Sequence, residues 1–238
     1  MGVIFLDLDS TLIDLNSSKV WVGEMYRAGS IRLSQLLRAS WTLARYRLGA
    51  TDISGALEGA IRELKGWPAD EFAAQLLTLA DRVVDAHLRP EVRPLCAAYR
   101  ARGERLVILS SASQILVDRV AERLALDAAI GNRFAVDDEG ALSGALDGPL
   151  VFGAEKIDRA REFLLAQDAA EESHRFTLEE SAFYSDSYAD LPLLERVGRP
   201  RVVCPDQRLH RAARARAWPV LNWGRAGETP TPLERELL

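Results

Sequence analysis

Short apolar runs alternate with longer amphipathic segments along most of the chain. Residues 3–6, 105–109, 182–184 and 201–204 are runs rich in β-branched and aromatic side chains, which are typical of buried parallel strands. Helical patterns follow or separate them at 90–102, 114–124, 156–166 and from residue 205 to about 217. Residues 134–151 carry two clusters of turn residues and predict a β-hairpin. The alternation favours an α/β fold with a parallel sheet.

The segment after the first apolar run has a different pattern. Residues 17–88 contain no strand signal, and three glycine-containing breaks near 29, 49 and 66 divide them into four predicted helices. We therefore expect an α/β core made of residues 1–14 and 89–222, with a helical cap of residues 15–88 inserted after the first strand. Glycines and prolines make residues 223–238 a predicted loose tail.

Composition narrows the class of protein. The chain has 238 residues, of which 48% are hydrophobic and 27% charged, a balance that supports an ordinary hydrophobic core. The net charge of -5 gives no reason to expect nucleic acid as a partner. Asp7 and Asp9 interrupt the early apolar stretch, which argues against a signal peptide, so a soluble, cytoplasmic protein is expected. Cys96 and Cys204 have no ligand-like spacing and predict neither a disulfide nor a zinc site.

Polar residues at the ends of the predicted strands form the candidate site. They are Asp7 and Asp9 after the first strand, Ser110 and Ser111 after the second, Lys156 at the start of a helix, and Asp186 and Asp190 after the third strand. Each has an ordinary structural interpretation as a turn residue, a helix cap or a solvated side chain. The ends of parallel strands meet at one edge of a sheet, where α/β proteins bind ligands, so together the four groups predict one site.

These residue types suit the transfer of a phosphoryl group. A phosphate monoester dianion repels an anionic nucleophile, and Mg²⁺, a lysine and hydroxyl or amide donors offset that repulsion. Asp7 and Asp186 offer the few carboxylate oxygens that Mg²⁺ prefers. A carboxylate nucleophile divides one difficult displacement into two easier steps. Asp9, on the same side of a strand-like segment, is placed to exchange protons with the leaving group and water.

The clusters resemble the four signatures of the haloacid dehalogenase superfamily. Residues 7–12, read Asp-Leu-Asp-Ser-Thr-Leu, resemble the first signature, Ser110 the second, Lys156 the third, and residues 185–190 the fourth. A helical insertion directly after the first signature resembles subfamily IB, the phosphoserine-phosphatase-like branch. The resemblance covers residues 3–222 and implies a Rossmann-like doubly wound parallel sheet with an inserted helical cap.

The resemblance also implies a role for each residue. Asp7 would be the nucleophile and Asp9 the general acid and base, with the Asp9 backbone carbonyl on Mg²⁺. Ser110, the Ser111 amide and Lys156 would hold the phosphoryl group. Asp186 would bind Mg²⁺, and Asp190 would do so directly or through water. The expected activity is a Mg²⁺-dependent phosphatase that acts on a small organic phosphomonoester through an aspartyl-phosphate.

Several positions depart from phosphoserine phosphatases. Ser111-Ala112 and Ser187 stand where those enzymes usually carry glycines. Asn16 replaces the glutamate expected for the substrate amine, and Ala60 replaces the arginine expected for its carboxylate. Residues 184–195 and 205–221 look closer to a sister group, some of whose members resemble histidinol-phosphate phosphatases while others are fused to glycerolipid acyltransferases. Phosphoserine, histidinol phosphate and a lipid phosphate therefore all remain candidate substrates.

Two further alternatives concern the class of protein. A phospho-acceptor signalling module also uses aspartates at strand ends, but it is shorter and places its acceptor on a later strand. A binding protein with an inactive site is opposed by the retained Asp7, Asp9, Lys156 and Asp186. Residues 26–49 contain five arginines and no acid, with an apolar stripe. Contact with a membrane surface is possible for such a segment, but we favour a cap helix whose arginines face water.

Overall fold

The computed structural model describes residues 2–29, 53–170 and 176–232, and a six-stranded parallel sheet forms their centre. The strand order is β3-β2-β1-β6-β7-β8. The bounds are β1 Val3–Leu6, β2 Arg105–Ser113, β3 Ala128–Asn132, β6 Ala182–Ser185, β7 Arg199–Val203 and β8 Val220–Leu221. Strand β1 lies between β2 and β6, and Leu6 is in register with Ile108 and Tyr184. The predicted α/β fold is confirmed.

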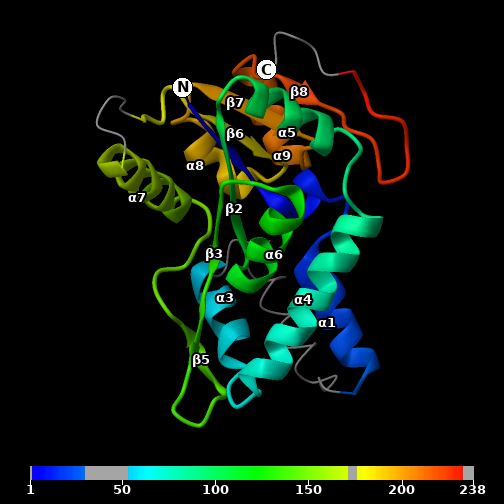
Figure 1. The fold of residues 1–238 in the computed structure, drawn as a ribbon, viewed down its shortest axis with the longest axis vertical. Helices are drawn as coiled ribbons and strands as arrows, with labels where there is room; N and C mark the ends of the chain where they lie inside the picture. The colour runs from blue at the N-terminus through cyan, green and yellow to red at the C-terminus, as the bar shows by residue number, and fades with distance from the viewer. Residues whose placement is uncertain (1, 30–52, 171–175, 233–238) are drawn as a thin grey trace.

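Helices cover both faces of this sheet (Figure 1). Successive side chains of a strand point to opposite faces, so β1 sends Ile4 and Leu6 into one core and Val3 and Phe5 into another. The first core also contains side chains of α5 (Val92–Ala101) and α6 (Gln114–Leu124). The second contains those of α7 (Glu155–Ala170), α8 (Leu191–Leu194) and α9 (Gln207–Ala215). Strands β1 and β6 are buried along their whole length, which explains their nearly continuous apolar sequences.

The inserted helices lie below the sheet in Figure 1. They are α1 (Ser17–Arg27), α3 (Ile53–Arg62) and α4 (Ala69–Ala86). The helix predicted between the breaks near residues 29 and 49, with most of the basic stretch, lies outside the described residues. The hairpin of β4 (Phe134–Val136) and β5 (Leu142–Leu146) is attached to these helices by two backbone hydrogen bonds. The Gly66 amide donates to the Leu142 carbonyl, and the Leu142 amide donates to the Trp67 carbonyl, each at 2.8 Å. The hairpin, predicted as part of the core range 89–222, thus also contacts the inserted helices.

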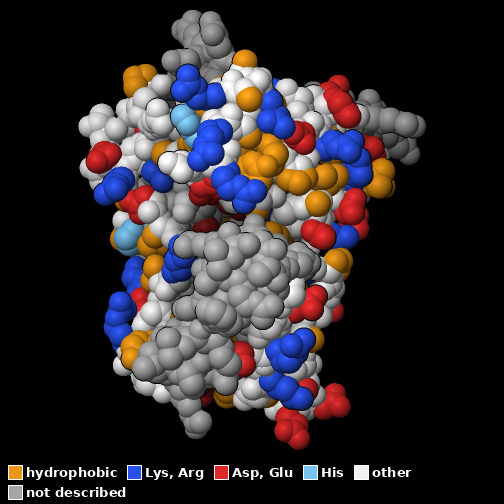
Figure 2. Space-filling model, turned by 180° about the vertical axis from the view of Figure 1, so that it is seen from behind, with side chains coloured by type: hydrophobic (Ala, Val, Ile, Leu, Met, Phe, Trp, Pro, Cys, Tyr) orange, Lys and Arg blue, Asp and Glu red, His pale blue; other side chains and the backbone are white. Residues whose placement is uncertain are grey.

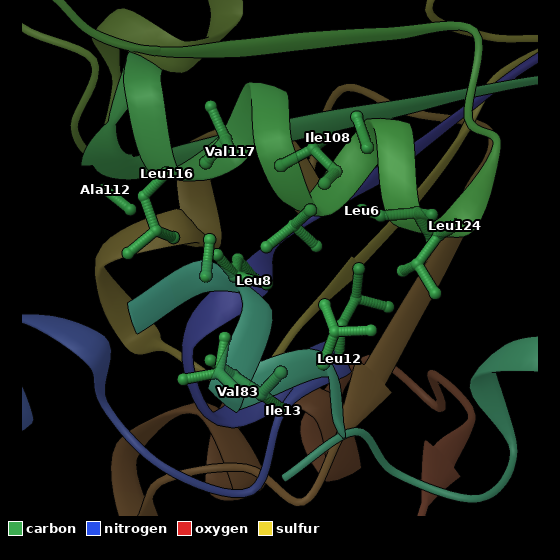
Figure 3. Close-up of a cluster of buried hydrophobic side chains, with 14 of the residues drawn as sticks. Leu6, Leu8, Leu12, Ile13, Val83, Ile108, Ala112, Leu116, Val117 and Leu124 are labelled. Carbon is green, nitrogen blue, oxygen red and sulfur yellow. The ribbon is translucent and has the colours of Figure 1, made fainter. Parts of the chain in front are cut away.

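An apolar cluster connects the sheet to the inserted helices (Figure 3). Leu8 and Leu12 come from the turn after β1, Val83 from α4 and Leu116 from α6. Leu8, Leu12 and Val83 are fully buried. Because burial of such side chains stabilises the packed state by about 1.5–3 kcal/mol each, the cluster fixes the turn that carries Asp9.

Two strands were missed by the pattern, and the tail differs from its expectation. Ala128–Asn132 ends in Gly-Asn, and β8 has two residues, so neither presents a clear apolar run.

Residues 223–231 are held against the core rather than loose. Trp223 stacks on Tyr184 with ring centroids 5.8 Å apart, and the amides of Gly224 and Thr231 each donate to the Glu91 carboxylate at 2.9 Å. Among the described residues, no helix is both long and apolar enough to cross a bilayer.

The same segment touches both stretches that join the core to the inserted helices. In the outgoing stretch, Asp14 accepts a hydrogen bond from the Ala226 amide at 3.0 Å. In the returning stretch, the Arg89 guanidinium donates to the carbonyls of Trp223 and Gly224 at 3.3 and 2.8 Å. Residues 223–231 therefore form a clasp, the name used below, across the two joining stretches.

Candidate active site

The turn after β1 brings two carboxylates into the edge of the sheet. Asp7 continues the strand and donates its amide to the Tyr184 carbonyl of β6 at 2.9 Å. Asp9 (φ -65°, ψ 128°) and Ser10 (φ 61°, ψ -6°) then have the dihedrals of a type II turn. Ser10 occupies the left-handed position that usually holds glycine, a conformation that costs about 1–3 kcal/mol and that packing must maintain. The turn places the Thr11 hydroxyl 3.3 Å from Asp186.

Lys156 connects the first and fourth groups of the candidate site. Its ammonium donates to Asp7 Oδ1 at 3.0 Å and to Asp190 Oδ2 at 2.8 Å, and its side chain is only 3% exposed. The Ser185 hydroxyl donates to the same Asp190 oxygen at 2.7 Å. Lys156 also lies over the Phe183 ring, 5.4 Å from its centroid. Residues separated by 149 and 34 positions in the chain thus meet in one buried cluster.

The electrostatics of this cluster are dominated by burial and by excess negative charge. Burial raises the pKa of Asp7 to about 6, with Lys156 opposing the effect and the charge of Asp190 adding to it. Burial, followed by the charges of Asp7 and Asp190, raises the pKa of Asp186 to about 8. For Lys156, burial alone would lower the pKa, yet Asp190 and Asp7 outweigh it and hold the pKa above its ordinary value. One lysine therefore does not neutralise the carboxylates around it.

Asp9 points toward the start of the inserted helices. Its Oδ1 accepts the backbone N–H of Ser17 at 2.8 Å, so this carboxylate helps to begin α1. Burial raises the pKa of Asp9, opposed mainly by that hydrogen bond. A carboxyl group with a raised pKa holds its proton to higher pH, as a general acid requires.

Ser110 and Ser111 were expected to follow the second strand, but β2 extends to Ser113 and contains both; the register, which pairs Leu6 with Ile108, brings them near Asp7. Ser110 is 1% exposed, and its Oγ lies 3.4 Å from the Ala112 amide. The Ser111 carbonyl accepts a 2.7 Å hydrogen bond from Asn132, whose Oδ1 accepts the Val151 amide at 2.8 Å. Asn132 was not among the predicted site residues, because it ends β3, a strand without a clear sequence pattern.

The chemistry of the donors bears on whether a metal ion fits. Among the described residues, no group of three or more His, Cys, Asp or Glu side chains is arranged to hold a metal ion by itself. Mg²⁺, however, is commonly bound by one or two carboxylates, with water and substrate phosphate completing the shell. Burial, and after it the negative charge of Asp7, raises the pKa of Asp186, and a bound divalent cation would offset that negative charge. The pair fits Mg²⁺, whereas Asp190 is already bonded to Lys156 and Ser185.

A cavity of about 480 Å³ lies between the sheet edge and the inserted helices. Ser17, beside Asp9, and Ser111, beside Ser110, belong to its lining. The space-filling view shows acidic side chains inside a shaded hollow between the upper and lower parts of the molecule (Figure 2). The candidate catalytic groups therefore have a neighbouring space that can receive the rest of a substrate.

Comparison with known proteins places this arrangement in context. A model of the haloacid dehalogenase-like hydrolase family matches residues 4–195. A histidinol-phosphatase of Neisseria meningitidis serogroup C (strain 8013) is 27% identical over 223 residues, which cover 93% of this chain and 99% of that protein.

Solved structures show the same fold. A protein of unknown function from Bordetella pertussis Tohama I superposes with a TM-score of 0.78 at 25% identity, covering 93% of this chain and 98% of that chain. A substrate-bound phosphoserine phosphatase complex superposes with a TM-score of 0.64 at 20% identity, covering 92% of both chains.

Proposed function

Because the chain belongs to the haloacid dehalogenase-like hydrolase family, we propose that it is a Mg²⁺-dependent phosphatase acting on a small organic phosphomonoester. The observation that carries the proposal is the buried cluster in which Lys156 bonds to both Asp7 and Asp190, with Asp186 beside them. An ion pair with a purely structural role needs one carboxylate, not three. Buried carboxylates in excess of the one lysine destabilise the fold unless a bound cation neutralises them, alone or together with an anionic substrate.

In the proposed first step, an Asp7 carboxylate oxygen attacks the phosphorus of the substrate. The bond between phosphorus and the ester oxygen breaks, and Asp9 gives its proton to the departing alkoxide. This step needs Asp7 ionised and Asp9 protonated. Lys156, 3.0 Å from Asp7, favours the ionised nucleophile, and burial favours the protonated form of Asp9.

In the proposed second step, water attacks the phosphorus of the aspartyl-phosphate. Asp9, now a carboxylate, takes the proton of that water, the bond between Asp7 and phosphorus breaks, and inorganic phosphate leaves. Asp7, Asp186 and the Asp9 backbone carbonyl would hold Mg²⁺, which supplies positive charge against the phosphate. The Ser110 hydroxyl, the Ser111 amide and Lys156 would donate to the phosphoryl oxygens.

Of the three candidate substrates, histidinol phosphate and phosphoserine also correspond to the names of similar proteins. Histidinol phosphate is favoured by the 27% identical relative of nearly equal length. Phosphoserine is disfavoured, because the Asn16 side chain caps α1 by accepting the Lys19 amide at 3.0 Å, and Ala60 offers no charge to a carboxylate. A zwitterion without charged partners would be expensive to desolvate.

The test is release of phosphate from an aryl phosphate, with Mg²⁺ and with a chelator, for the wild type and for Asp7→Asn. We expect turnover that depends on Mg²⁺ and is lost in the variant. Asp118→Asn, the same change on the exposed face of α6, is the matched control and should retain activity. Full activity of Asp7→Asn, or turnover unaffected by removing the metal, would overturn the proposal.

A second measurement follows the covalent intermediate. With the aryl phosphate, whose leaving group needs little protonation, Asp9→Asn should still form the aspartyl-phosphate but lose the base for the second step, so the peptide containing Asp7 should gain one phosphoryl group after rapid acid quench and mass spectrometry. Phosphorylation at another residue would assign the nucleophile elsewhere.

A further inference from the structure

The cavity beside the catalytic groups has an aromatic wall. Trp21 lies between Trp67 and Phe72, with ring centroids 5.3 and 5.5 Å apart, and Phe134 contacts Phe72 at 5.0 Å. All four rings line the cavity, and they come from α1, the stretch before α4, α4 itself and β4. The Trp21 indole N–H already donates to Gln75 at 3.1 Å, so this ring needs no polar partner from a ligand. Trp21 and Phe72 are only 7% and 3% exposed, whereas Trp67 and Phe134 are half-buried, so most of the ring surface open to a ligand belongs to Trp67 and Phe134.

Charge is scarce in the same lining. Among the described residues of the cavity, the ionisable side chains are Glu63 and Lys65, which are exposed and follow the end of α3. The remaining polar groups are the short hydroxyls of Ser17, Ser18, Ser111 and Ser113 and the amide of Asn132. A charged group placed among these short polar side chains, away from Glu63 and Lys65, would lose water without gaining an ion pair from the described lining.

The cavity adjoins residues of the proposed chemistry at two points, although Asp7, Asp9 and Lys156 are not themselves part of its lining. Ser17 lines it and donates its amide to Asp9, the proposed acid for the leaving group. Ser111 lines it and follows Ser110, whose hydroxyl would hold the phosphoryl group. The organic part of the substrate, rather than the phosphate, therefore occupies this space.

We propose that the substrate is a phosphomonoester whose leaving alcohol carries a compact, uncharged aromatic group that packs against Trp21, Trp67, Phe72 and Phe134. The inference rests on the proposed phosphatase function and deepens it. A volume of about 480 Å³ is within the range of pockets that enclose one small organic molecule. Offset and edge-to-face ring contacts would orient the ester toward Asp7.

The test compares four alkyl phosphates. They are 2-phenylethyl, propyl, decyl and 2-aminoethyl phosphate. The first three have leaving alkoxides of similar basicity, and the ammonium group of the fourth makes its alkoxide a better leaving group, so intrinsic reactivity does not favour the expected result. We expect kcat/KM for 2-phenylethyl phosphate to exceed that for each of the others by at least about tenfold. Equal values, or a preference for the amine, would overturn the inference, and a preference for decyl phosphate would show that an aliphatic chain occupies the cavity instead.

Variants at Trp67 connect the preference to the wall. Trp67→Ala should lower kcat/KM for 2-phenylethyl phosphate by about tenfold and leave propyl phosphate within about twofold. Trp67→Phe, which keeps a ring, should retain most of the preference even if Trp67→Ala folds poorly. Trp218→Ala, the same change outside the lining, should alter neither substrate. Unchanged selectivity in a folded Trp67→Ala protein would overturn the inference.

Binding without turnover separates this inference from the proposed function. Calorimetry of wild type and Asp7→Asn with 2-phenylethylphosphonate and 2-aminoethylphosphonate needs no catalysis. If no phosphate ester is hydrolysed, the proposed function fails, yet at least tenfold tighter binding of the phenyl compound would still support the aromatic site. Equal binding of the two phosphonates would overturn the inference whatever the enzyme hydrolyses.

Discussion

Replacing Asp186 by asparagine removes one buried negative charge while keeping nearly the same shape. In the wild type, burial and the charges of Asp7 and Asp190 raise the pKa of Asp186 from 3.8 to about 8. The folded protein therefore holds a proton on this carboxyl between pH 4 and 8, whereas the unfolded chain has lost it. The stability that comes from holding this proton is complete below about pH 4 and is lost as the pH rises toward 8.

The magnitude follows from the same values. A solution at pH 7 is about three pH units above the ordinary pKa of Asp186, and each unit corresponds to about 1.4 kcal/mol of free energy of unfolding. Ionisable Asp186 thus lowers the free energy of unfolding by about 4 kcal/mol relative to a neutral side chain, and partial solvent exposure reduces this to about 2–4 kcal/mol. Asparagine retains an oxygen for the Thr11 hydroxyl, so little else is lost.

The assay is urea unfolding of wild type and Asp186→Asn in a chelator at pH 4 and pH 7. We expect equal stability at pH 4 and a variant more stable by about 2–4 kcal/mol at pH 7. Saturating Mg²⁺ should stabilise the wild type by about 2.7 kcal/mol at a hundred times its Kd and the variant far less, with loss of turnover. A variant less stable than wild type at pH 7, or one stabilised equally by Mg²⁺, would refute the reasoning.

Three further substitutions separate chemistry from stability. Lys156→Met should reduce kcat at least about a hundredfold and lower the free energy of unfolding by about 3–5 kcal/mol at pH 8. The loss of stability should become smaller below about pH 6, because Asp7 then takes a proton. Kinetic and unfolding measurements at both pH values check this. Asp9→Asn should reduce kcat by about 10²–10⁴ but change stability by less than about 1 kcal/mol, since the amide oxygen still accepts the Ser17 N–H; a large loss of stability would contradict this. Ser113→Ala should raise the free energy of unfolding by about 1 kcal/mol, because its buried Oγ has no partner among the described residues and does not cap α6; a lower thermal midpoint would count against it.

Much of the fold was predictable because its strands are short and fully buried. The runs at 3–6 and 182–184 have no room for polar residues on either face, so their sequences alone mark them as β1 and all but the last residue of β6. The helix over 114–124 begins and ends where its pattern predicts. The strand β3 was not predicted, because Gly131 and Asn132 interrupt its apolar run. It forms in the structure through parallel pairing with β2.

The candidate site was predictable in its members but not in its pairings. Strand ends of a parallel sheet share one edge, so Asp7 and Asp186 were expected together. The bond between Lys156 and Asp190, and the attachment of Asp9 to the first turn of α1, depend on side-chain directions that a sequence does not specify. The aromatic wall was likewise hidden, since Phe134 comes from a hairpin far along the chain from Trp21.

The clasp of residues 223–231 has a consequence for the order in which the protein is made. Strand β1 and the inserted helices leave the ribosome first, but Asp14 and Arg89 find their clasp partners only after residue 226 has been synthesised. A nascent or prematurely terminated chain can complete the sheet through β8 and still lack these hydrogen bonds across the joining stretches. The two stretches that join the core to the inserted helices therefore gain these hydrogen bonds only after β8 has been synthesised.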